Sequence, residues 1–456
     1  MILSLLYQKK IFIAIAKNLF LCHNTPLCYY RFNESFMKKN IEQYDVIVIG
    51  GGPSGMMCAG RAGELGAKVL LLEKNASLGN KLMLTGGGRC NITNADFDTN
   101  SFLNNFGEAK KYLFSPFSQF SVQDTFNFFQ NRSLPLVTEA RNRVFPKSQN
   151  VQDVFDTLIE YMRRSNVTIK TNTQVMSLER DDKKILLLND SNHNKYEADN
   201  FVIATGGLAA PETGATGDGL NFLEKMGHKV HASNPNLVPL KTDAKWVRNL
   251  SGITWSFMKI RFVQNGKTQV RKTGKILFTH FGISGPLVIN LAHEVKALLK
   301  NGPVEAVIDL FPDTDEKALD KKMIKLLDKY QDKKMRNVLP EMIFKNIALE
   351  ILNMPHLKLG KKEAKFITKE ERRALVHTIK NLTFSISGTC GMEKAIVADG
   401  GVTLSEVDFK NMTSRKYSNL YLTGDILNIN RPSGGFSLQL CWTTGYVAGS
   451  DIGRQK

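Results

Sequence analysis

The sequence predicts an α/β protein in which a three-layer ββα domain is interrupted by a β-barrel-like domain and a helical subdomain. Three observations predict this fold class. An apolar run at 44–49 leads into a glycine-rich loop, and a second run at 68–72 closes a strand–loop–helix–strand unit. From about 234 to 309 the pattern changes to short alternating strands with turn residues. Residues 315–380 then carry apolar side chains at helical spacing.

The first unit has the pattern of a buried parallel strand followed by a turn and a helix. Tyr44–Ile49 (YDVIVI) is an almost continuous apolar run, as a strand covered on both faces requires. GGGPSG follows, and a helix is expected over Met56–Leu65 with Gly66 as the residue beyond its end. Lys68–Leu72 (KVLLL) is expected to be a second buried strand, and Glu73 follows it directly.

Gly50, Gly52 and Gly55 form the pattern G-x-G-x-x-G between that strand and that helix. We interpret Gly50 as the residue of the tight turn, Gly52 as the point where the backbone approaches a pyrophosphate, and Gly55 as a close helix–strand contact. The helix N-terminus offers free N–H groups to the phosphates. Glu73 lies 23 residues after Gly50, where a carboxylate can accept the ribose hydroxyls. The sequence therefore predicts a Rossmann-like site for FAD or NAD rather than NADP.

Further strands are expected in three later segments. Val167–Leu178 is interpreted as paired strand material, and Phe201–Ala204 and Asn419–Leu422 as buried strands. Asn265 and Gly266 predict a hairpin turn. The expected organisation is an N-terminal extension at 1–42, a dinucleotide-binding domain at 43–232 and 398–456, an inserted β-barrel-like substrate domain at 233–314 and 381–397, and a basic helical subdomain at 315–380.

Composition limits the class of protein. With 42% hydrophobic and 23% charged residues, the 456-residue chain reads as an ordinary soluble protein with more than one core. The formal net charge of +18 favours anionic partners such as dinucleotides, acidic metabolites, nucleic acid or lipid headgroups. The six cysteines have no C-x-x-C spacing, which argues against a disulfide scaffold, a zinc site and a dithiol relay. We expect a cytoplasmic protein without a metal.

Residues 1–36 contain short apolar stretches broken by Lys17, with no acid before Glu34. Neither stretch reaches the roughly 20 residues that a membrane span needs. Two interpretations stay open: a targeting segment, or a mis-called start with translation beginning at Met37.

Several separated motifs resemble one protein family. They are DVIVIGGGPSG at 45–55, NKLMLTGGGRCNITN at 80–94, RVFPKS at 143–148, ATGGLAAPETGATGDG at 204–219, LFTHFGISGP at 277–286 and NLYLTGDILNINRPSGGFSLQ at 419–439. In these motifs the chain resembles the HI0933-like (YhiN or BaiN-type) FAD-dependent oxidoreductases, a branch of the glutathione-reductase-like flavoproteins. The resemblance extends from about Tyr44 to the C-terminus. It implies a flavoprotein with non-covalent FAD and an oxidoreductase activity.

The motifs and the resemblance together imply the cofactor-binding residues. The glycine-rich TGGGRCN loop is interpreted as a backbone nest for an anion or a flavin edge, with Arg89 beside it. By resemblance, Asp425 binds a ribityl hydroxyl and the helix after Gly435 faces the flavin. The full expected set is Gly50, Gly52, Pro53, Ser54, Gly55, Glu73, Lys74, Lys81, Thr85, Gly86, Gly87, Gly88, Arg89, Cys90, Asn91, Val175, Ala204, Thr205, Gly206, Gly424, Asp425, Gly434, Gly435 and Phe436.

Catalytic residues are less well defined by the sequence. Arg143, His280 and Arg431, with Arg141 beside the first, are candidates for holding a substrate oxygen or stabilising charge during hydride transfer. For Cys90 and Cys390 a structural role is favoured over a nucleophilic one. The stretch before RVFP reads EARN where the family pattern implies a glycine next to the Arg, which affects the expected local pocket geometry.

The electron donor and the substrate stay open. No second G-x-G-x-x-G follows a strand, since GATGDG at 214–219 has the wrong spacing, so NAD(P)H is expected to dock only transiently. Family members are described as aminoacetone oxidases using O2 or as reductases of unsaturated 3-oxo bile-acid intermediates. The leading hypothesis is an NAD(P)H-linked oxidoreductase of a small or medium organic molecule.

Two alternatives belong to other classes. One is an RNA-binding or RNA-modifying flavoprotein that uses the helical segment 315–380, which holds 17 Lys or Arg against 10 Asp or Glu. Its few aromatic residues are spaced as core residues, and stable nucleic-acid binding is not expected. The other is a non-catalytic FAD sensor or a protein attached to a membrane by residues 1–36, although no integral membrane association is expected.

Overall fold

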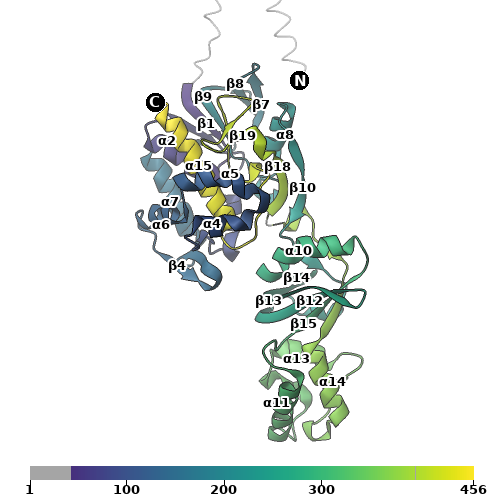
Figure 1. Ribbon diagram of the computed structural model, residues 1–456. Coiled ribbons are helices and arrows are strands. Elements are labelled where there is room, and N and C mark those ends of the chain that lie inside the picture. Colours follow the sequence, from purple (N-terminus) through teal and green to yellow (C-terminus); the bar gives the residue numbers. More distant parts are fainter. Residues whose placement is uncertain (1–42, 396) are drawn as a thin grey trace, which may run out of the picture. The chain divides into compact units, whose positions relative to one another are not determined.

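The computed structural model describes residues 43–395 and 397–456 (Figure 1). The expected N-terminal extension at 1–42 lies outside the described residues. A parallel sheet forms the first layer, and its strands at 44–49, 69–72 and 420–422 are mostly buried, as strands covered on both faces are. In the order β21-β9-β1-β2-β6, its strands are β1 (Gln43–Ile49), β2 (Val69–Leu72), β6 (Thr168–Lys170), β9 (Lys195–Ile203) and β21 (Leu420–Leu422).

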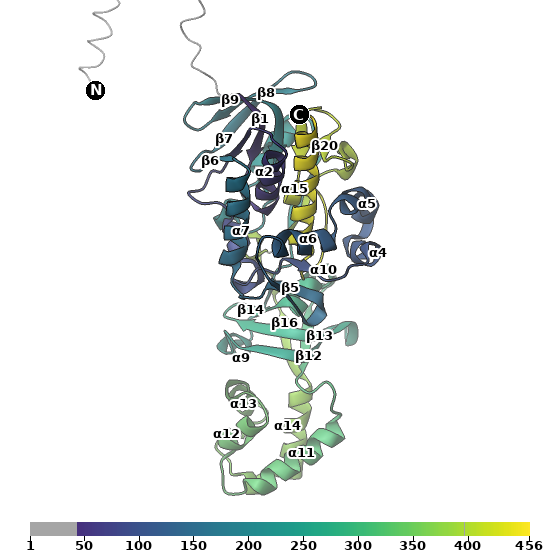
Figure 2. The same ribbon diagram turned by 90° about the vertical axis from the view of Figure 1, so that its left-hand side faces the viewer.

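Three helices pack together on this sheet (Figure 2): α2 (Pro53–Glu64), α7 (Val151–Arg164) and α15 (Phe436–Arg454). Glycines permit the close approach of α15 to α2. A Cβ on Gly445 would lie 2.4 Å from the carbonyl oxygen of Ser54, and one on Gly449 would lie 2.5 Å from that of Cys58. With Gly453, these residues form a four-residue repeat along one side of α15. The helix continues to Arg454.

An antiparallel extension forms the remaining β layer. β7 (Val175–Arg180) pairs with β8 (Ile185–Asp190), and β8 pairs with the N-terminal half of β9. Val167–Leu178 contains paired strands, as the sequence interpretation expected, but the two strands pair with different partners. β6 joins the parallel sheet beside β2, whereas β7 belongs to the antiparallel extension. The fold is the predicted α/β class, with a Rossmann-like sheet in a ββα arrangement.

The inserted segment contains a second, curved sheet of seven strands in the order β16-β15-β12-β13-β14-β11-β17. β16 and β17 stand at opposite ends of this order, yet only Ser387 separates them in the chain. The sheet therefore curls back on itself in a barrel-like form. The strands are β11 (Leu240–Lys241), β12 (Thr254–Gln264), β13 (Lys267–Thr279), β14 (Gly282–Ser284), β15 (Val304–Asp309), β16 (Leu382–Ile386) and β17 (Gly388–Thr389).

Four helices follow β15 and share one hydrophobic core with the curved sheet. Leu319 and Ile347 pack in the same buried cluster as Ile260 and Phe262 of β12. Asp315 caps the first of these helices, and Thr368 forms a capping box with Glu371 at the last. The helices are α11 (Glu316–Lys329), α12 (Met335–Val338), α13 (Lys345–Leu352) and α14 (Lys369–Lys380).

The other elements connect these layers. β10 (Val230–Asn236) and β18 (Val397–Val402) pair as the two strands that lead into and out of the insertion. The rest are α3 (Asn80–Met83), β3 (Thr93–Asn94), α4 (Thr99–Leu103), α5 (Lys110–Gln119), α6 (Val122–Gln130), β4 (Leu136–Glu139), β5 (Arg143–Pro146), α8 (Asp218–Lys225), α9 (Lys245–Asn249), α10 (Pro286–Leu299), β19 (Val407–Asp408) and β20 (Thr413–Ser414), with short 3₁₀ turns between them.

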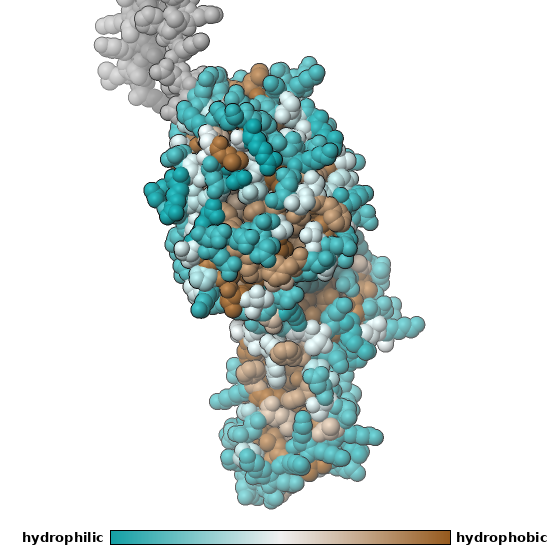
Figure 3. Space-filling model, turned by 60° about the vertical axis from the view of Figure 1, so that its left-hand side comes forward, coloured by the Kyte–Doolittle hydropathy of each residue, from teal (hydrophilic) through white to brown (hydrophobic). Residues whose placement is uncertain are grey.

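The surface drawn in Figure 3 is mainly hydrophilic, with hydrophobic side chains gathered in small patches. Across residues 43–395 and 397–456, no helix combines the length and the apolar character that crossing a bilayer requires.

Candidate functional site

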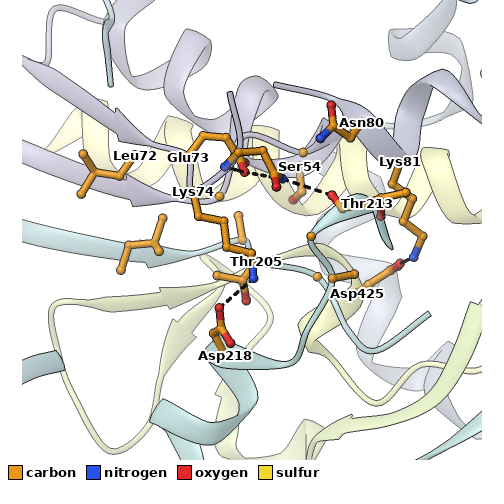
Figure 4. Close-up of a pocket in the computed structure, with 18 of the residues that line it drawn as sticks. Ser54, Leu72, Glu73, Lys74, Asn80, Lys81, Thr205, Thr213, Asp218 and Asp425 are labelled. Carbon is orange, nitrogen blue, oxygen red and sulfur yellow. Dashed lines mark hydrogen bonds and ion pairs between the residues drawn. The ribbon is translucent and has the colours of Figure 1, made fainter. Parts of the chain in front are cut away.

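Four parallel strands end at the same level and open into one cavity (Figure 4). Ile49 of β1 pairs with Leu72 on one side and with Ile203 on the other, and Ile203 pairs with Leu422. The next residues along these strands, Gly50, Glu73, Ala204 and Thr423, all line the cavity. Ligands of open α/β sheets bind at this carboxyl edge, where strand ends and helix N-termini meet.

The glycine loop is arranged around this edge. Gly50 has φ +106°, and a Cβ there would lie 2.7 Å from the carbonyl oxygen of Ala204. A Cβ on Gly55 would lie 2.0 Å from the carbonyl oxygen of Gly50, so helix and loop touch through bare backbone. A Cβ on Gly52 would meet no atom within 4 Å. Gly52 therefore faces open space in the cavity and leaves room for a phosphate group.

Glu73 is held at the end of β2 by backbone and side-chain donors. Its Oε2 accepts from the N–H of Gly51 at 2.8 Å, and its Oε1 accepts from the backbone and side-chain nitrogens of Asn75 at 2.9 and 2.8 Å. The residue is 8% exposed and lines the cavity. A carboxylate has about four acceptor positions, so capacity remains for a ribose hydroxyl.

Residues 213–218, which the sequence interpretation did not assign to the cofactor site, complete the end of the cavity beside Glu73. Lys74 Nζ forms an ion pair with Asp218 Oδ2 at 2.8 Å, as Figure 4 shows, and Asn75 donates to the carbonyl oxygen of Thr213 at 3.1 Å. Asp218 belongs to the GATGDG stretch, which is therefore part of the same site. Because Asp218 pairs with Lys74, that lysine does not present an uncompensated cation for a 2′-phosphate.

Asp425 lies at the other end of the cavity between two cations. Lys81 Nζ contacts its Oδ2 at 3.2 Å, and Arg431 donates to its Oδ1. Burial raises the pKa of Asp425, but the charges of Arg431 and Lys81 outweigh it and bring the pKa to about 2. Asp425 is therefore ionised at neutral pH. It can accept hydrogen bonds from hydroxyl groups and cannot donate one.

Two threonine hydroxyls in this region have no partner. Thr205 and Thr423 both line the cavity, and the Oγ1 atoms of both are buried without a hydrogen bond to any of the residues described. Buried hydroxyls usually have partners, so a bound polar ligand is a physical reason for such atoms. A bare backbone at Gly52, a carboxylate at each end and these hydroxyls fit a dinucleotide.

The TGGGRCN loop does not line this cavity. Gly86, Gly87 and Gly88 have consecutive positive φ values of 60°, 69° and 83°, a backbone that favours glycine. The side-chain amide of Asn91 can accept from the N–H of Gly435 at 3.0 Å and so joins this loop to the start of α15. The loop therefore lies beside the Gly434–Gly435 turn that the sequence also selected.

Arg89 and Arg143 share one carboxylate outside the cavity. Arg89 contacts Glu139 at 3.0 Å and Gln149 at 2.7 Å, and Arg143 lies 3.6 Å from Glu139. Arg141 and Asn142 have φ values of 63° and 56°, which are uncommon for residues other than glycine. A glycine, which the resemblance implies next to the Arg, would adopt this left-handed backbone at lower cost.

His280 and Arg431 both lie outside the lining of this cavity. His280 is exposed in the turn between β13 and β14, and its carbonyl oxygen accepts from Arg248. Arg431 is buried and donates to Asp425, to the carbonyl oxygen of Ile429 and to Ser437. Neither lines the cavity. Burial raises the pKa of Cys90 to about 12 and also raises that of Cys390, so these thiols stay protonated at neutral pH.

The expected cofactor set divides into two groups. Those lining the cavity are Gly50, Gly52, Pro53, Ser54, Glu73, Lys74, Lys81, Val175, Ala204, Thr205, Gly206 and Asp425. Those outside its lining are Gly55, Thr85, Gly86, Gly87, Gly88, Arg89, Cys90, Asn91, Gly424, Gly434, Gly435 and Phe436.

Fifteen lining residues were not selected from the sequence: Ile49, Leu72, Asn75, Gly79, Asn80, Thr173, Gln174, Thr213, Gly214, Ala215, Gly217, Asp218, Phe222, Thr423 and Cys441. Six of them directly precede or follow a selected residue, and the strand-end rule would have found Ile49, Leu72 and Thr423 among these. The pairing of Asp218 with Lys74 is a contact between distant segments, and spacing gives no signal for it.

Comparisons with known proteins agree with this arrangement. The family model of the HI0933-like protein Rossmann domain matches residues 44–451. The 3-dehydro-bile acid delta(4,6)-reductase of Clostridium scindens is 29% identical over 406 residues, covering 88% of this chain and 97% of the relative. The ribosomal RNA dihydrouridine synthase of Escherichia coli is 27% identical over 416 residues, covering 90% and 98%.

Among solved structures, a 3-ketosteroid-delta4-(5alpha)-dehydrogenase from Rhodococcus jostii has a TM-score of 0.53 at 14% identity, covering 92% of this chain and 99% of that one. This likeness concerns the fold alone.

Proposed function

Because the chain belongs to the HI0933-like family and is an FAD-dependent oxidoreductase, we propose that it reduces a carbon–carbon double bond conjugated to a carbonyl group. One observation carries the proposal. Two relatives that align over nearly their whole length are named for different substrates, but both names describe reduction of this kind of bond. A 3-dehydro steroid with unsaturation in the ring is an enone, and the C5=C6 bond of uracil is conjugated to the C4 carbonyl.

The residues of the cavity support the binding of FAD in a fixed orientation. Glu73 is placed to accept ribose hydroxyls, and the N-terminus of α2 beside Gly52 to receive the pyrophosphate. Asp425, ionised between Lys81 and Arg431, is placed to accept a ribityl hydroxyl. When bound, the flavin supplies the hydride that the substrate receives. The chain supplies position and charge.

The start of α15 adds a further electrostatic contribution. This helix has 19 residues and begins at Phe436 after the left-handed Gly435, with no side chain capping its first turn. Its free N–H groups and its positive dipole end therefore favour a negative group nearby. Stabilising negative charge at this position would favour reduction of a bound flavin.

We propose NAD(P)H as the electron donor. The described chain holds one dinucleotide site at the carboxyl edge of the parallel sheet, and FAD would occupy it. A nicotinamide would therefore have to bind transiently, in alternation with the substrate. Oxidation by O2 of a small amino-ketone is the competing outcome.

Anaerobic stopped-flow spectroscopy tests the proposal. The purified protein is mixed with NADH or NADPH, and bleaching near 450 nm is followed; reoxidation is then measured with an enone steroid and with a uridine-containing RNA. We expect rapid bleaching by a pyridine nucleotide and reoxidation by at least one acceptor. Bleaching by aminoacetone but by neither nucleotide would overturn the reductase in favour of an oxidase.

A further inference from the structure

The inserted domain contains a long acid-free segment. Residues 245–293 hold eight Lys or Arg and no Asp or Glu, although the whole chain has 43 acidic against 61 basic residues. An even distribution of the acids would place four or five of them in this segment, so their absence is a local charge asymmetry. A local excess of cations without anions creates a positive potential that attracts anionic partners.

Most of these cations stand on one β-hairpin, β12–β13, which we call the basic hairpin: Lys259, Arg261, Lys267, Arg271, Lys272 and Lys275. Arg261 and Arg271 are directly opposite each other in its register. Like charges at such positions disfavour folding, which indicates that another role retains them. Arg271, Lys272 and Lys275 are exposed, and none forms an ion pair with any residue in the described ranges.

Neighbouring carboxylates compensate this charge only in part. Asp309 of β15 stands opposite Lys259, but it is already paired with Lys380 at 2.7 Å. Glu305 stands opposite Val263, near the turn of the hairpin. The end of the hairpin that holds Lys272 and Lys275 therefore keeps its positive charge.

The basic hairpin contacts Arg141, which lies in the turn between β4 and β5. Arg141 donates to the carbonyl oxygen of Thr273 at 3.3 Å, and its guanidinium lies against Gly274. Lys272, two residues before Gly274, projects to the same side of the strand. The carbonyl oxygens of Arg141 and Gly434 both accept from the side-chain amide of Asn94. Arg141 and Asn94 therefore connect the basic hairpin to the turn before α15.

An exposed aromatic residue, Phe257, interrupts the pairing of the basic hairpin near Lys275. Phe257 is 75% exposed and has φ +62°, a conformation that is costly for a bulky side chain. It sits in a β-bulge, because the register shifts between Trp255 and Met258 opposite Lys275. Trp255 itself stacks edge-on with the exposed Phe344 at 5.0 Å. Exposed aromatic rings beside cations are the elements that bind unpaired nucleobases and phosphates.

We propose that the basic hairpin binds the phosphate backbone of RNA and that Phe257 stacks on an unpaired base. The inference rests on the proposed function, because uracil is one of its two substrate classes. The helical segment 315–380 is the weaker candidate, since it carries ten acidic residues beside its 17 basic ones and several of its cations form ion pairs. Arg372 pairs with Asp320 at 2.7 Å, and Lys362 pairs with Glu371 at 2.7 Å.

Fluorescence anisotropy with the FAD-loaded, full-length protein tests the surface. The probe is a fluorescein-labelled RNA stem–loop with uridines in its loop, titrated at about 50 to 200 mM KCl. The variant R271Q/K272Q/K275Q removes three charges from the basic hairpin. The matched control K321Q/K322Q/K325Q removes three charges from exposed, unpaired lysines of α11 within the described chain. F257G removes the ring and suits the left-handed backbone.

We expect the hairpin variant to bind RNA roughly 10- to 50-fold more weakly, with the salt slope reduced by about 2, since each single-strand phosphate contact contributes about 0.7. F257G should weaken binding by roughly 5-fold or more without reducing the salt slope, because stacking is not ionic. The α11 control should bind as the wild type does.

The proposal would be overturned if the hairpin variant and the α11 control lost RNA affinity equally. It would also be overturned if the wild type bound phosphatidylglycerol vesicles tightly and the hairpin variant lost vesicle affinity and RNA affinity by the same factor. Wild-type protein that does not bind the RNA would also overturn it, while flavin bleaching and enone reduction would leave the proposed function standing. Conversely, RNA binding through the hairpin without any reduction of a conjugated double bond would contradict the proposed function and leave the surface intact.

Discussion

Arg431 is buried against the carboxylate of Asp425 at the carboxyl edge of the parallel sheet. Its side chain is 1% exposed, and its other nitrogens donate to the carbonyl oxygen of Ile429 and to Ser437. Every branch of the guanidinium is therefore used within the protein. In this arrangement Arg431 is a positioning residue that holds Asp425 and the loop before α15, and it does not offer a free cation to a substrate.

Removing this arginine should destabilise the protein strongly. R431M leaves Asp425 with Lys81 as its only charged partner among residues 43–395 and 397–456, and breaking a buried ion pair from one side costs about 3–5 kcal/mol. Urea unfolding of the FAD-free protein measures the change. R415M is the matched control, because Arg415 is exposed and lies 4.0 Å from Asp408, so its loss should cost less than about 1 kcal/mol. Similar unfolding free energies for the two variants would contradict the positioning role.

The second and third glycines of the dinucleotide loop, Gly52 and Gly55, should respond differently to alanine. Gly52 has φ −77° and open space around a Cβ, so G52A should change the free energy of unfolding of the FAD-free protein by less than about 0.5 kcal/mol. A methyl group in that space would nevertheless obstruct the pyrophosphate, and FAD affinity should fall by tenfold or more. Isothermal titration of FAD into the stripped protein measures this loss.

G55A serves as the contrasting variant. Its Cβ would lie 2.0 Å from the carbonyl oxygen of Gly50, which forces helix and loop apart and should cost about 1–3 kcal/mol or more in the FAD-free protein. If G52A instead destabilised the FAD-free protein while retaining FAD affinity, the assignment of its open space to the cofactor would be wrong.

Glu73 should contribute to FAD affinity through its charge. E73Q keeps the shape of the side chain and loses the carboxylate, and hydrogen bonds to a charged group are worth about 1.5–3 kcal/mol. We expect FAD to bind roughly 10- to 100-fold more weakly, as measured by quenching of flavin fluorescence. E224Q, on an exposed position of α8, is the control and should bind FAD as the wild type does. An unchanged dissociation constant for E73Q would remove Glu73 from the site.

The sequence was sufficient where the determining contacts are local. The glycine loop, the strand ends at Ile49 and Leu72 and the acid at Glu73 follow one another within a single strand–helix–strand unit, so spacing alone places them together. The Asn265–Gly266 turn is equally local, with φ values of 51° and 71° that suit a tight hairpin. The α/β fold and the family were therefore predicted correctly.

The remaining features depend on contacts between distant segments. Asp218 joins the site because Lys74, 144 residues earlier, reaches it, and the glycine spacing around Asp218 suggested no such role. The burial of Arg431 likewise follows from its partners and not from its residue type. The assignments of individual cofactor-binding residues stay predictions until a ligand-bound state is measured.

His228 should make the stability of the protein depend on pH. Its ring is enclosed, with Nδ1 2.9 Å from Glu406 Oε2 and Nε2 3.1 Å from Ser414 Oγ. Burial lowers the pKa of His228 below its usual value of 6.5, although Glu406 opposes the shift. The unfolded chain therefore binds this proton at a higher pH than the folded protein does. The stability that the neutral ring provides is complete above about pH 6.5 and is lost as the pH falls from there toward the folded-state pKa.

We expect the free energy of unfolding, measured in urea between about pH 7.5 and 5, to fall more steeply for the wild type than for H228Q. H231Q is the control, since His231 lies in an exposed position bonded to Thr403, and it should keep the wild-type slope. Parallel pH profiles for wild type and H228Q would show that the buried ring does not titrate in this range.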